Sequence, residues 1–166
     1  MQTPATPKFT TREFRDVLGN FATGIAVVTS RDTEGRPVGC TINSFASVSL
    51  DPPLVSFCID RQAGTFAAFQ SHGHFALHFL AEHQEEVSRR FAKAGEDKFG
   101  AVEPVAGIGN VPLLSDCLAH LECSVYQRID AGDHVLILGR VEAFSSRKDL
   151  PPLLYFRGRY ARVASE

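Results

Sequence analysis

The chain has 166 residues, of which 44% are hydrophobic and 22% are charged. This length fits one domain with a single core, and this composition excludes a disordered chain and a fibrous repeat. Its 17 basic and 19 acidic side chains give a net charge of −2, without the basic excess typical of nucleic-acid binding, and no apolar run approaches the roughly 20 residues of a membrane helix.

The first residues of the chain lack the apolar core that a signal peptide has. We therefore expect a soluble, cytoplasmic protein that binds neither nucleic acid nor a membrane. Residues 1–9 contain two prolines and predict a flexible tail, whereas residues 10–166 predict a single domain without an internal repeat or a linker.

An amphipathic helix is predicted directly after the tail. Thr10 and Glu13 have the spacing of a capping box. Apolar side chains then recur at helical spacing, at Phe14, Val17, Leu18 and Phe21. The pattern predicts that this helix ends at Gly24.

Three strands are predicted next, over residues 25–29, 38–44 and 54–59, from their β-branched and apolar runs. Residues 32–37 connect the first two strands, and Glu34-Gly35 suits a tight turn. Pro52 and Pro53 interrupt the hydrogen bonding between strands before the third strand, because proline has no backbone N–H to donate.

The second half of the chain alternates short helices with strands before ending in long strands. The predicted helices cover residues 65–70, with Phe66 and Phe69 inward, and residues 82–92, with Val87 and Phe91 inward. The predicted strands cover residues 74–80, 118–129, 134–144 and 153–163, and a hairpin turn at residues 130–133 joins the two long ones. The Gly-rich stretch 93–110 predicts a surface loop. Short strands with antiparallel connections favour a closed or partly closed β-barrel with a few helices at its ends.

The four cysteines are expected to be reduced, structural thiols. Cys40, Cys58, Cys117 and Cys123 form no C-x-x-C pair, and each lies among apolar or β-forming neighbours. A nucleophilic cysteine would need a nearby base, which the spacing does not reveal.

The most polar strand-like stretch runs over residues 41–49, as Thr-Ile-Asn-Ser-Phe-Ala-Ser-Val-Ser. Its hydroxyls and amide either form the polar outer face of a strand or face a polar ligand. Ser56 and Asp60 add polar groups on the next strand, and Thr65 at the following helix start either caps that helix or meets a phosphate.

Common nucleotide and nucleophile motifs are missing from the chain. Gly107-Ile108-Gly109 lacks the third glycine of the dinucleotide fingerprint, and the sequence contains neither a P-loop nor a G-x-S-x-G elbow. A metal site is an alternative interpretation, because His72, His74 and His78 would point to the same face of a continuous strand and His83 follows. Their spacing lacks the adjacent aspartate of common metallohydrolase sites, so we expect no metal.

Several motifs together resemble the flavin reductase family, the small NAD(P)H:flavin oxidoreductases that supply two-component monooxygenases. Residues 21–29, Phe-Ala-Thr-Gly-Ile-Ala-Val-Val-Thr, resemble the opening motif of that family. Further matching segments are residues 39–49, Asp51-Pro52-Pro53-Leu54, Arg90-Phe91-Ala92, Lys98-Phe99, Gly132-Asp133-His134 and Tyr155-Phe156-Arg157-Gly158-Arg159-Tyr160. These segments follow the family order and span nearly the whole chain.

The resemblance implies a mainly β split barrel of the Greek-key, FMN-binding type with a few flanking helices. It also implies a homodimer with flavin in a groove near the dimer interface. The implied cofactor-binding residues fall into three groups. Along the flavin ring and ribityl chain the resemblance places Thr41, Asn43, Ser44, Phe45, Ser47, Ser49, Ser56 and Cys58. Around the ribityl and phosphate it places Asp60, Thr65, Arg90, Phe91, Lys98 and Phe99, and on the nicotinamide face it places His134, Tyr155, Arg157, Gly158 and Tyr160. The stretch Gln62-Ala63-Gly64-Thr65 departs from relatives that carry more serine or lysine there.

The implied activity is NAD(P)H-dependent reduction of FMN or FAD by hydride transfer, with delivery of the reduced flavin to a separate monooxygenase. His134 is the implied catalytic residue, beside the nicotinamide. Such a reaction is mainly a positioning problem, because the cofactors carry the reactive chemistry and no catalytic triad is needed. NADH is favoured over NADPH, although Arg157 and Arg159 could meet a 2′-phosphate. Two alternatives remain open: a flavin-binding module without turnover, and a flavin oxidase on a similar barrel.

Overall fold

A computed structural model describes residues 8–95, 97–100 and 104–164. The predicted tail, residues 1–9, lies outside this part of the chain except for its last two residues. The helices are α1 (Thr11–Leu18), α2 (Phe66–Ser71) and α3 (Glu85–Ala92), with short 3₁₀ turns η1 (Glu82–Gln84) and η2 (Ile108–Asn110). The strands are β1 (Thr23–Gly24), β2 (Ala26–Arg31), β3 (Pro37–Ile42), β4 (Ala46–Leu50), β5 (Pro53–Asp60), β6 (His74–Phe79), β7 (Val105–Ala106), β8 (Pro112–Leu113), β9 (Ala119–Ala131), β10 (His134–Ser146), β11 (Leu154–Phe156) and β12 (Arg159–Ala161).

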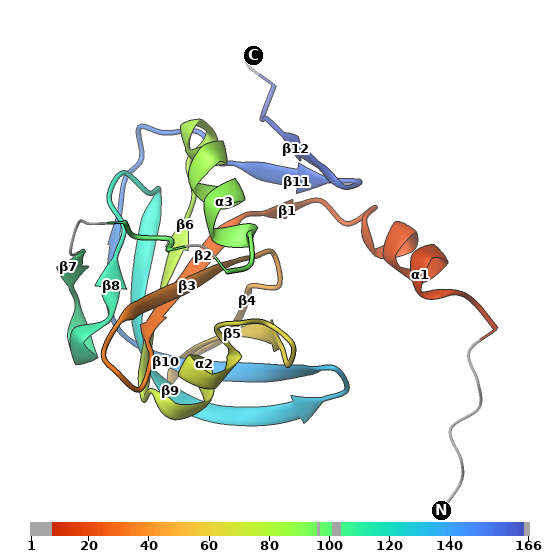
Figure 1. Cartoon of the computed structure of the whole chain (residues 1–166). Coiled ribbons are helices and arrows are strands. Elements are labelled where there is room, and N and C mark those ends of the chain that lie inside the picture. The colour runs from red at the N-terminus through yellow and green to blue at the C-terminus, as the bar shows by residue number, and fades with distance from the viewer. Residues whose placement is uncertain (1–7, 96, 101–103, 165–166) are drawn as a thin grey trace, which may run out of the picture.

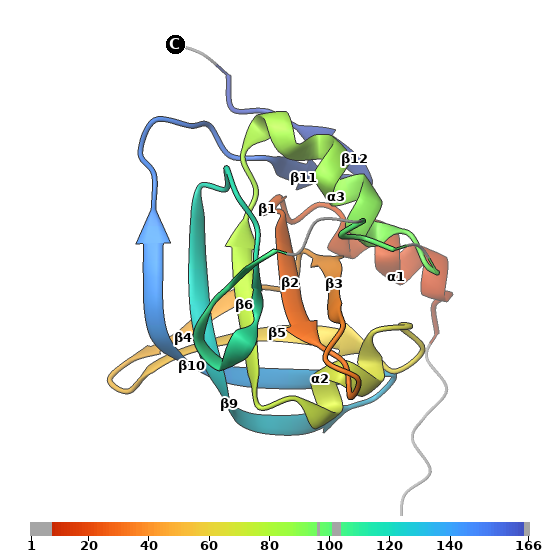
Figure 2. The ribbon, with the colours of Figure 1, turned by 60° about the vertical axis from the view of Figure 1, so that its left-hand side comes forward.

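A seven-stranded sheet forms the body of the protein, in the order β3-β2-β6-β9-β10-β5-β4. Every neighbouring pair in it is antiparallel, and the sheet curls into a barrel (Figures 1 and 2). A small sheet of β1, β11 and β12 lies beside α3 at one end of the barrel. The prediction of a β-barrel with a few helices is therefore confirmed. None of the described helices is long and apolar enough to cross a membrane.

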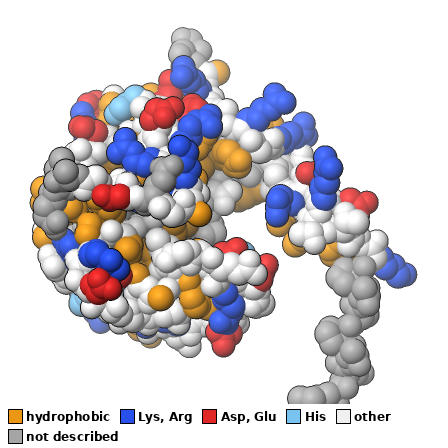
Figure 3. All heavy atoms as spheres, in the orientation of Figure 1, with side chains coloured by type: hydrophobic (Ala, Val, Ile, Leu, Met, Phe, Trp, Pro, Cys, Tyr) orange, Lys and Arg blue, Asp and Glu red, His pale blue; other side chains and the backbone are white. Residues whose placement is uncertain are grey.

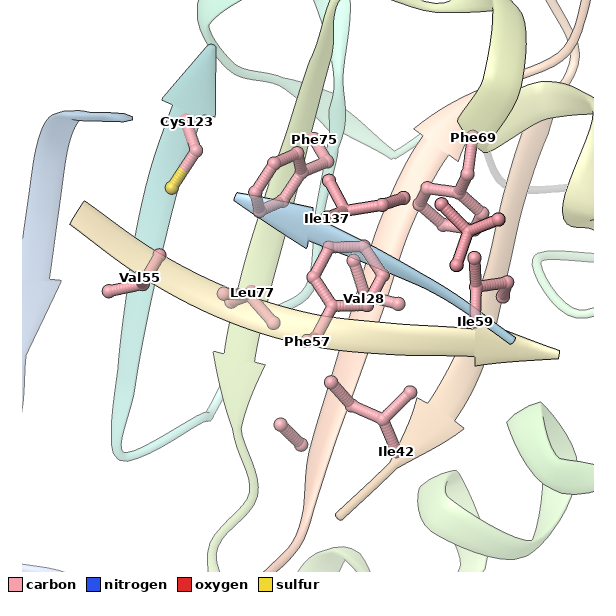
Figure 4. Close-up of a cluster of buried hydrophobic side chains, with 12 residues drawn as sticks. Val28, Ile42, Val55, Phe57, Ile59, Phe69, Phe75, Leu77, Cys123 and Ile137 are labelled. Atoms are coloured by element: carbon pink, nitrogen blue, oxygen red, sulfur yellow. The ribbon is translucent and has the colours of Figure 1, made fainter. Parts of the chain in front are cut away.

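The barrel encloses an apolar core built from alternating residues of its strands. Phe57 of β5 is fully buried and makes edge-to-face contacts with Phe69 and Phe75, at 5.7 and 5.1 Å between ring centroids. Leu77 and Ile137 from other strands pack around the same rings (Figure 4). Because successive strand residues point to opposite faces, these inward positions recur with a period of two.

Strand β2 is buried on both faces because a second apolar cluster covers its outer side. Val28 faces the barrel core, whereas Val27 belongs to the outer cluster together with Phe91 of α3 and Leu153. The inward prediction for Phe91 is confirmed, and α3 is held against the barrel by this contact. The predicted helix over residues 82–92 begins with the 3₁₀ turn η1 before α3.

The long β9–β10 hairpin contains a β-bulge where Gly139 packs against the barrel core. The register between β9 and β10 shifts at Leu138/Gly139. A side chain at Gly139 would overlap the ring of Phe75 and press on Cys123, so the strand has room here only for glycine. The two-residue turn at Gly132-Asp133 confirms the predicted hairpin, and Gly132 has the positive φ (67°) that such a turn requires.

The predicted end of the first helix is wrong. The capping box between Thr10 and Glu13 is present, but α1 ends at Leu18 rather than at Gly24. The side-chain amide of Asn20 donates to the carbonyls of Asp16 and Val17 at 3.1 and 3.2 Å and closes the helix early. The helix stands apart from the barrel (Figures 1 and 3), and none of its residues is buried.

The single last strand predicted over residues 153–163 is also wrong. The segment folds into the hairpin of β11 and β12, whose turn is made by Arg157 and Gly158. Both turn residues have positive φ, 49° and 75°, as the commonest two-residue hairpin turn requires. The sequence signal for this turn is therefore the glycine inside an apparently continuous run.

The cysteine prediction is confirmed in the described residues, where all four thiols are free. Burial raises the pKa of the Cys117 thiol to about 11 and that of the Cys123 thiol to about 12. Neither thiol therefore ionises at neutral pH, which suits packing rather than nucleophilic chemistry.

Candidate functional site

Three adjoining cavities form a groove at one end of the barrel, next to α3. The His134 cavity, about 1060 Å³, lies between α1, the end of β3 and the β11–β12 turn. The Cys40 cavity, about 330 Å³, shares Asn43, Ser44 and His134 with it. The Lys98 cavity, about 340 Å³, shares Cys40 and Phe91 with the Cys40 cavity. We call these three cavities the groove; the molecular surface is hollowed between α1 and the barrel (Figure 3).

The polar residues after β3 form the middle of the groove. The backbone amide of Cys58 on β5 donates to the Ser44 hydroxyl at 3.0 Å, which fixes this loop against the neighbouring strand. Asn43 beside it is exposed, and its side chain makes no hydrogen bond within the described part of the chain. The groove therefore offers an amide with both donor and acceptor capacity to a ligand.

His134 lies where the His134 and Cys40 cavities meet. It is the first residue of β10 and pairs with Asp60 at the end of β5. Its Nδ1 lies 2.7 Å from the carboxylate of Asp133, and this contact holds the pKa of that carboxyl below its ordinary value. Because Nδ1 must donate to the carboxylate, the neutral ring keeps Nε2 as a hydrogen-bond acceptor.

The Lys98 cavity contains an unused polar group. The Thr65 hydroxyl is buried and has no hydrogen bond of standard geometry within the described residues; the Cys40 thiol beside it is only a weak partner. Burial raises the pKa of that thiol to about 11, against the opposing effects of Thr65 and Lys98. Lys98 lines the same cavity and donates to the carbonyl of Arg90 at 3.0 Å. A buried hydroxyl with only a weak partner among the described residues, next to a cation, fits a phosphate ligand.

Other candidate residues in the groove already have structural partners. The Thr41 hydroxyl donates to the carbonyl of Ser88 at 2.7 Å and ties β3 to α3. The Asp60 carboxylate accepts from the amide of Gln62 at 2.8 Å and shapes the loop before α2. Both residues line the Cys40 cavity, where they present the remaining polar atoms to a ligand.

Not every candidate lies in the groove. Tyr155, Arg157 and Gly158 line the His134 cavity, and Tyr160 lines a neighbouring cavity. Phe45 lines a different, apolar cavity of about 650 Å³, where it stacks edge-to-face on Phe79 at 4.8 Å. The described linings of the three groove cavities do not include Ser47, Ser49, Ser56, Arg90 or Phe99. Ser47 and Ser49 lie on β4, opposite Val55 and Leu54, and Phe99 packs edge-to-face on Phe91 at 5.2 Å.

The residues that form one wall of the His134 cavity were not predicted from the sequence. Arg15, Asp16 and Leu18 of α1 line it, together with Gly19 and Asn20. The Asn20 side chain accepts a hydrogen bond from Arg157 at 2.9 Å, and the Arg157 amide donates to the Gly19 carbonyl at 2.9 Å. The β11–β12 turn thus fixes the end of α1. A local sequence pattern cannot predict this contact between Asn20 and Arg157, because the two residues are 137 positions apart.

His78, one of the histidines that suggested a metal site, bonds to the backbone through both ring nitrogens. His78 is fully buried; its Nδ1 lies 3.1 Å from the carbonyl of Val27, and its Nε2 accepts from the amide of Leu114 at 3.1 Å. In the described part of the chain, no three His, Cys, Asp or Glu side chains are grouped to hold a metal ion. His78 therefore serves as a core residue that bridges two segments.

The sequence matches the family described as "Flavin reductase like domain" over residues 18–164, so the chain belongs to this family. A protein of Rhizobium meliloti (strain 1021) named "Probable flavin reductase" is 47% identical over 152 residues, which cover 92% of this chain and 49% of that protein. The chain thus spans about half the length of this relative.

Two further relatives match over most of their own length. The reductase subunit HsaB of a flavin-dependent monooxygenase from Rhodococcus jostii (strain RHA1) is 40% identical over 152 residues, covering 92% of this chain and 77% of that protein. The solved structure of the NADH:FAD oxidoreductase SgcE6 of Streptomyces globisporus C-1027 superposes with a TM-score of 0.87 at 34% identity, covering 100% of this chain and 96% of that one. The expected mainly β, split-barrel fold of the flavin reductases is thereby confirmed.

Proposed function

We propose that this chain is an NAD(P)H:flavin oxidoreductase that reduces FMN or FAD and supplies the reduced flavin to a separate monooxygenase. The single observation that carries the proposal is the groove itself. It joins an end suited to a phosphate, which contains the buried Thr65 hydroxyl and the cation of Lys98, to an end lined by His134. The HsaB relative, named as the reductase subunit of a flavin-dependent monooxygenase, supports the same role and the same kind of partner.

The residues of the groove act by binding and orientation. Flavin and nicotinamide supply the hydride chemistry when bound, so the protein has to hold two flat rings in register. Lys98 and the Thr65 hydroxyl would hold a flavin phosphate by charge-assisted and neutral hydrogen bonds. Asn43 and Ser44 would meet polar atoms of the flavin, and His134, fixed by Asp133, would orient the nicotinamide through its free ring nitrogen.

The proposal includes a homodimer. Apolar side chains of α1 and of the segment directly after it are exposed: Val17 of α1 is 66% exposed, and Phe21, three residues past the end of α1, is 78% exposed. Phe21 also forms part of the apolar cavity that contains Phe45 and Phe79. A second copy of the chain would cover these side chains, and sedimentation equilibrium measures whether it does. A monomer at micromolar concentration contradicts this part of the proposal.

We also propose that residues 10–166 form one domain and that the protein acts in the cytoplasm. Both apolar clusters share strand β2, so the two halves of the barrel and α3 depend on the same strand. Four free thiols fit a reducing compartment.

The test is the consumption of NADH by the purified chain with and without added FMN, followed at 340 nm. We expect loss of NADH absorbance that depends on flavin. Lys98→Ala should raise the KM for FMN by about tenfold and leave riboflavin unchanged, because only FMN carries a phosphate. The matched control is Lys148→Ala, an exposed lysine outside the described lining of the groove.

Two results would overturn the proposal. Tight flavin binding without consumption of either NADH or NADPH would make the chain a flavin-binding module. No binding of FMN, FAD or riboflavin would remove the flavin assignment of the groove altogether. An equal loss of FMN and riboflavin in Lys98→Ala would remove Lys98 from the phosphate end.

A further inference from the structure

Helix α1 forms one wall of the His134 cavity without being packed on the barrel. Arg15, Asp16 and Leu18 line the cavity, yet none of the eight residues of α1 is buried. Figures 1 and 3 show the helix projecting away from the barrel. A helix this short is unstable in water unless caps or packing support it. Contacts beyond the helix must therefore fix this wall of the cavity.

The side chain of Asn20 connects α1 to the β11–β12 turn. Its amide group donates to the carbonyls of Asp16 and Val17 at 3.1 and 3.2 Å, which satisfies two acceptors at the end of the helix. Its carbonyl oxygen accepts from the guanidinium of Arg157 at 2.9 Å, and the Arg157 backbone amide donates to the carbonyl of Gly19 at 2.9 Å. We call the two bonds made by Arg157 the α1 latch.

Arg157 occupies its place in the turn against the preference of its backbone. Its φ of 49° lies in the left-handed region, which favours glycine and asparagine. The guanidinium stacks on the ring of Phe156 at 5.0 Å and bonds to Asn20, so the side chain is used to reach α1. A residue held in an unfavourable backbone conformation points to a role for its side chain.

We propose that Asn20 is a positioning residue for the nicotinamide nucleotide, because through the α1 latch it holds α1 as a formed wall of the His134 cavity. The inference rests on the proposed function, which places the nicotinamide beside His134. When the latch opens, the cavity loses the part of its lining that α1 supplies. A nucleotide that binds only the closed form then binds more weakly, in proportion to the fraction of chains that are closed. Since the bound complex keeps its geometry, the latch acts on the KM of the nucleotide and leaves kcat unchanged.

Arg157→Gly is the first variant, because glycine suits the positive φ of the turn and removes the side-chain half of the latch. In the ligand-free chain, NMR should show about fivefold faster hydrogen exchange at the backbone amides of Gly19 and Asn20, which belong to the end of α1. With FMN as acceptor, the KM for NADH should rise about fivefold, while kcat and the Kd of FMN stay at their wild-type values.

The matched control is Arg36→Gly. Arg36 is also an arginine in a turn between two strands, and its guanidinium bonds to the carboxylate of Asp32 at 2.8 Å. It lies outside the described lining of the groove, so its loss should change neither the hydrogen exchange of α1 nor the KM for NADH.

A double-mutant cycle separates the latch from direct contact with the nucleotide. Asn20→Ala should raise the KM for NADH at least as much as Arg157→Gly, because it also removes the cap of α1. The double variant should match Asn20→Ala, since both changes remove the same bond. Effects that multiply in the double variant would mean that Arg157 contacts the nucleotide itself, which would overturn the inference.

Two other results would also overturn it. One is unchanged hydrogen exchange at the end of α1 in Arg157→Gly. The other is a fall in kcat and flavin affinity without a rise in the KM for NADH, as general destabilisation would cause. Because hydrogen exchange needs neither ligand nor turnover, it tests the latch even in a chain without reductase activity. Absence of that activity would count against the proposed function, and unchanged exchange would count against the latch.

Discussion

Lowering the pH should destabilise this protein through His78, a fully buried residue. Its ring is satisfied only when neutral, since Nδ1 donates to the carbonyl of Val27 and Nε2 accepts from the amide of Leu114. Adding a proton at Nε2 would set two donors against each other. The pKa of His78 is lowered to about 4, mainly by burial and to a smaller extent by His120 nearby, against the opposing effect of the hydrogen bond to Val27.

The sign and size of the effect follow from this pKa. Well above pH 6.5, His78 is neutral in both the folded and the unfolded chain, so its protonation does not alter the free energy of unfolding. Between pH 6.5 and about 4 the unfolded chain binds the extra proton, so the free energy of unfolding falls as the pH falls. With an unfolded pKa of about 6.5 and a folded pKa of about 4, the loss between pH 7.5 and pH 5 is about 2 kcal/mol.

Urea unfolding at pH 7.5, 6.5, 5.5 and 5 measures this loss in the wild-type chain and in His78→Gln. The variant should be less stable at pH 7.5, but its stability should depend less on pH, by about 2 kcal/mol over the same interval. His83→Gln is the matched control, because His83 is exposed and should leave the pH dependence as it is. Identical slopes for the wild-type chain and His78→Gln would refute the reasoning.

Three further predictions test packing, hydrogen bonding and the groove. Gly139→Ala should lower the free energy of unfolding by about 1 to 3 kcal/mol, because the new methyl group would overlap the buried Phe75 ring. In Gly73→Ala the added Cβ meets nothing within 4 Å, so equal losses in urea unfolding would contradict the packing argument. Tyr160→Phe should cost about 1 to 3 kcal/mol by leaving the buried Ser88 hydroxyl without its partner. The exposed Tyr126→Phe should be neutral, and a stable Tyr160→Phe would mean that this hydrogen bond contributes little. His134→Ala should lower kcat/KM for NADH by about tenfold while the Kd of FMN stays near its wild-type value, as steady-state kinetics and flavin titration measure. An equal loss of flavin affinity would move His134 to the flavin side of the groove.

Local sequence patterns predicted the parts of the fold that local physics controls. The capping box at Thr10 and the turn at Gly132-Asp133 depend on residues a few positions apart, and both form as expected. The end of α1 was mispredicted because the apolar stripe continues to Phe21, whereas the Asn20 side chain closes the helix at Leu18. A hydrophobic pattern records which face can be buried, and it does not record where the backbone is capped.

The candidate site was predictable in its residue types but not in its assembly. Polar residues that interrupt an apolar strand, such as Asn43 and Ser44, are visible in the sequence. The contribution of α1 to the His134 cavity depends on the bond between Asn20 and Arg157, which no local pattern encodes. Ser47 and Ser49 carry the same polar signal as Asn43, yet they lie on β4, which pairs with β5 rather than lining the groove. Composition alone cannot separate these two cases.

The order of strands explains why the groove forms where it does. Strand β10 pairs with β5, far earlier in the chain, and this register sets His134 opposite Asp60. The amide of Cys58, two residues before Asp60, holds the Ser44 hydroxyl, so the loop after β3 is brought to the same end of the barrel. Three segments that are distant in sequence thus meet through one strand, β5. A change that shifted the β5–β10 register by one residue would turn His134 to the opposite face and separate it from Asn43 and Ser44, because side chains alternate along a strand. The groove is therefore a property of the pairing register as much as of the residues that line it.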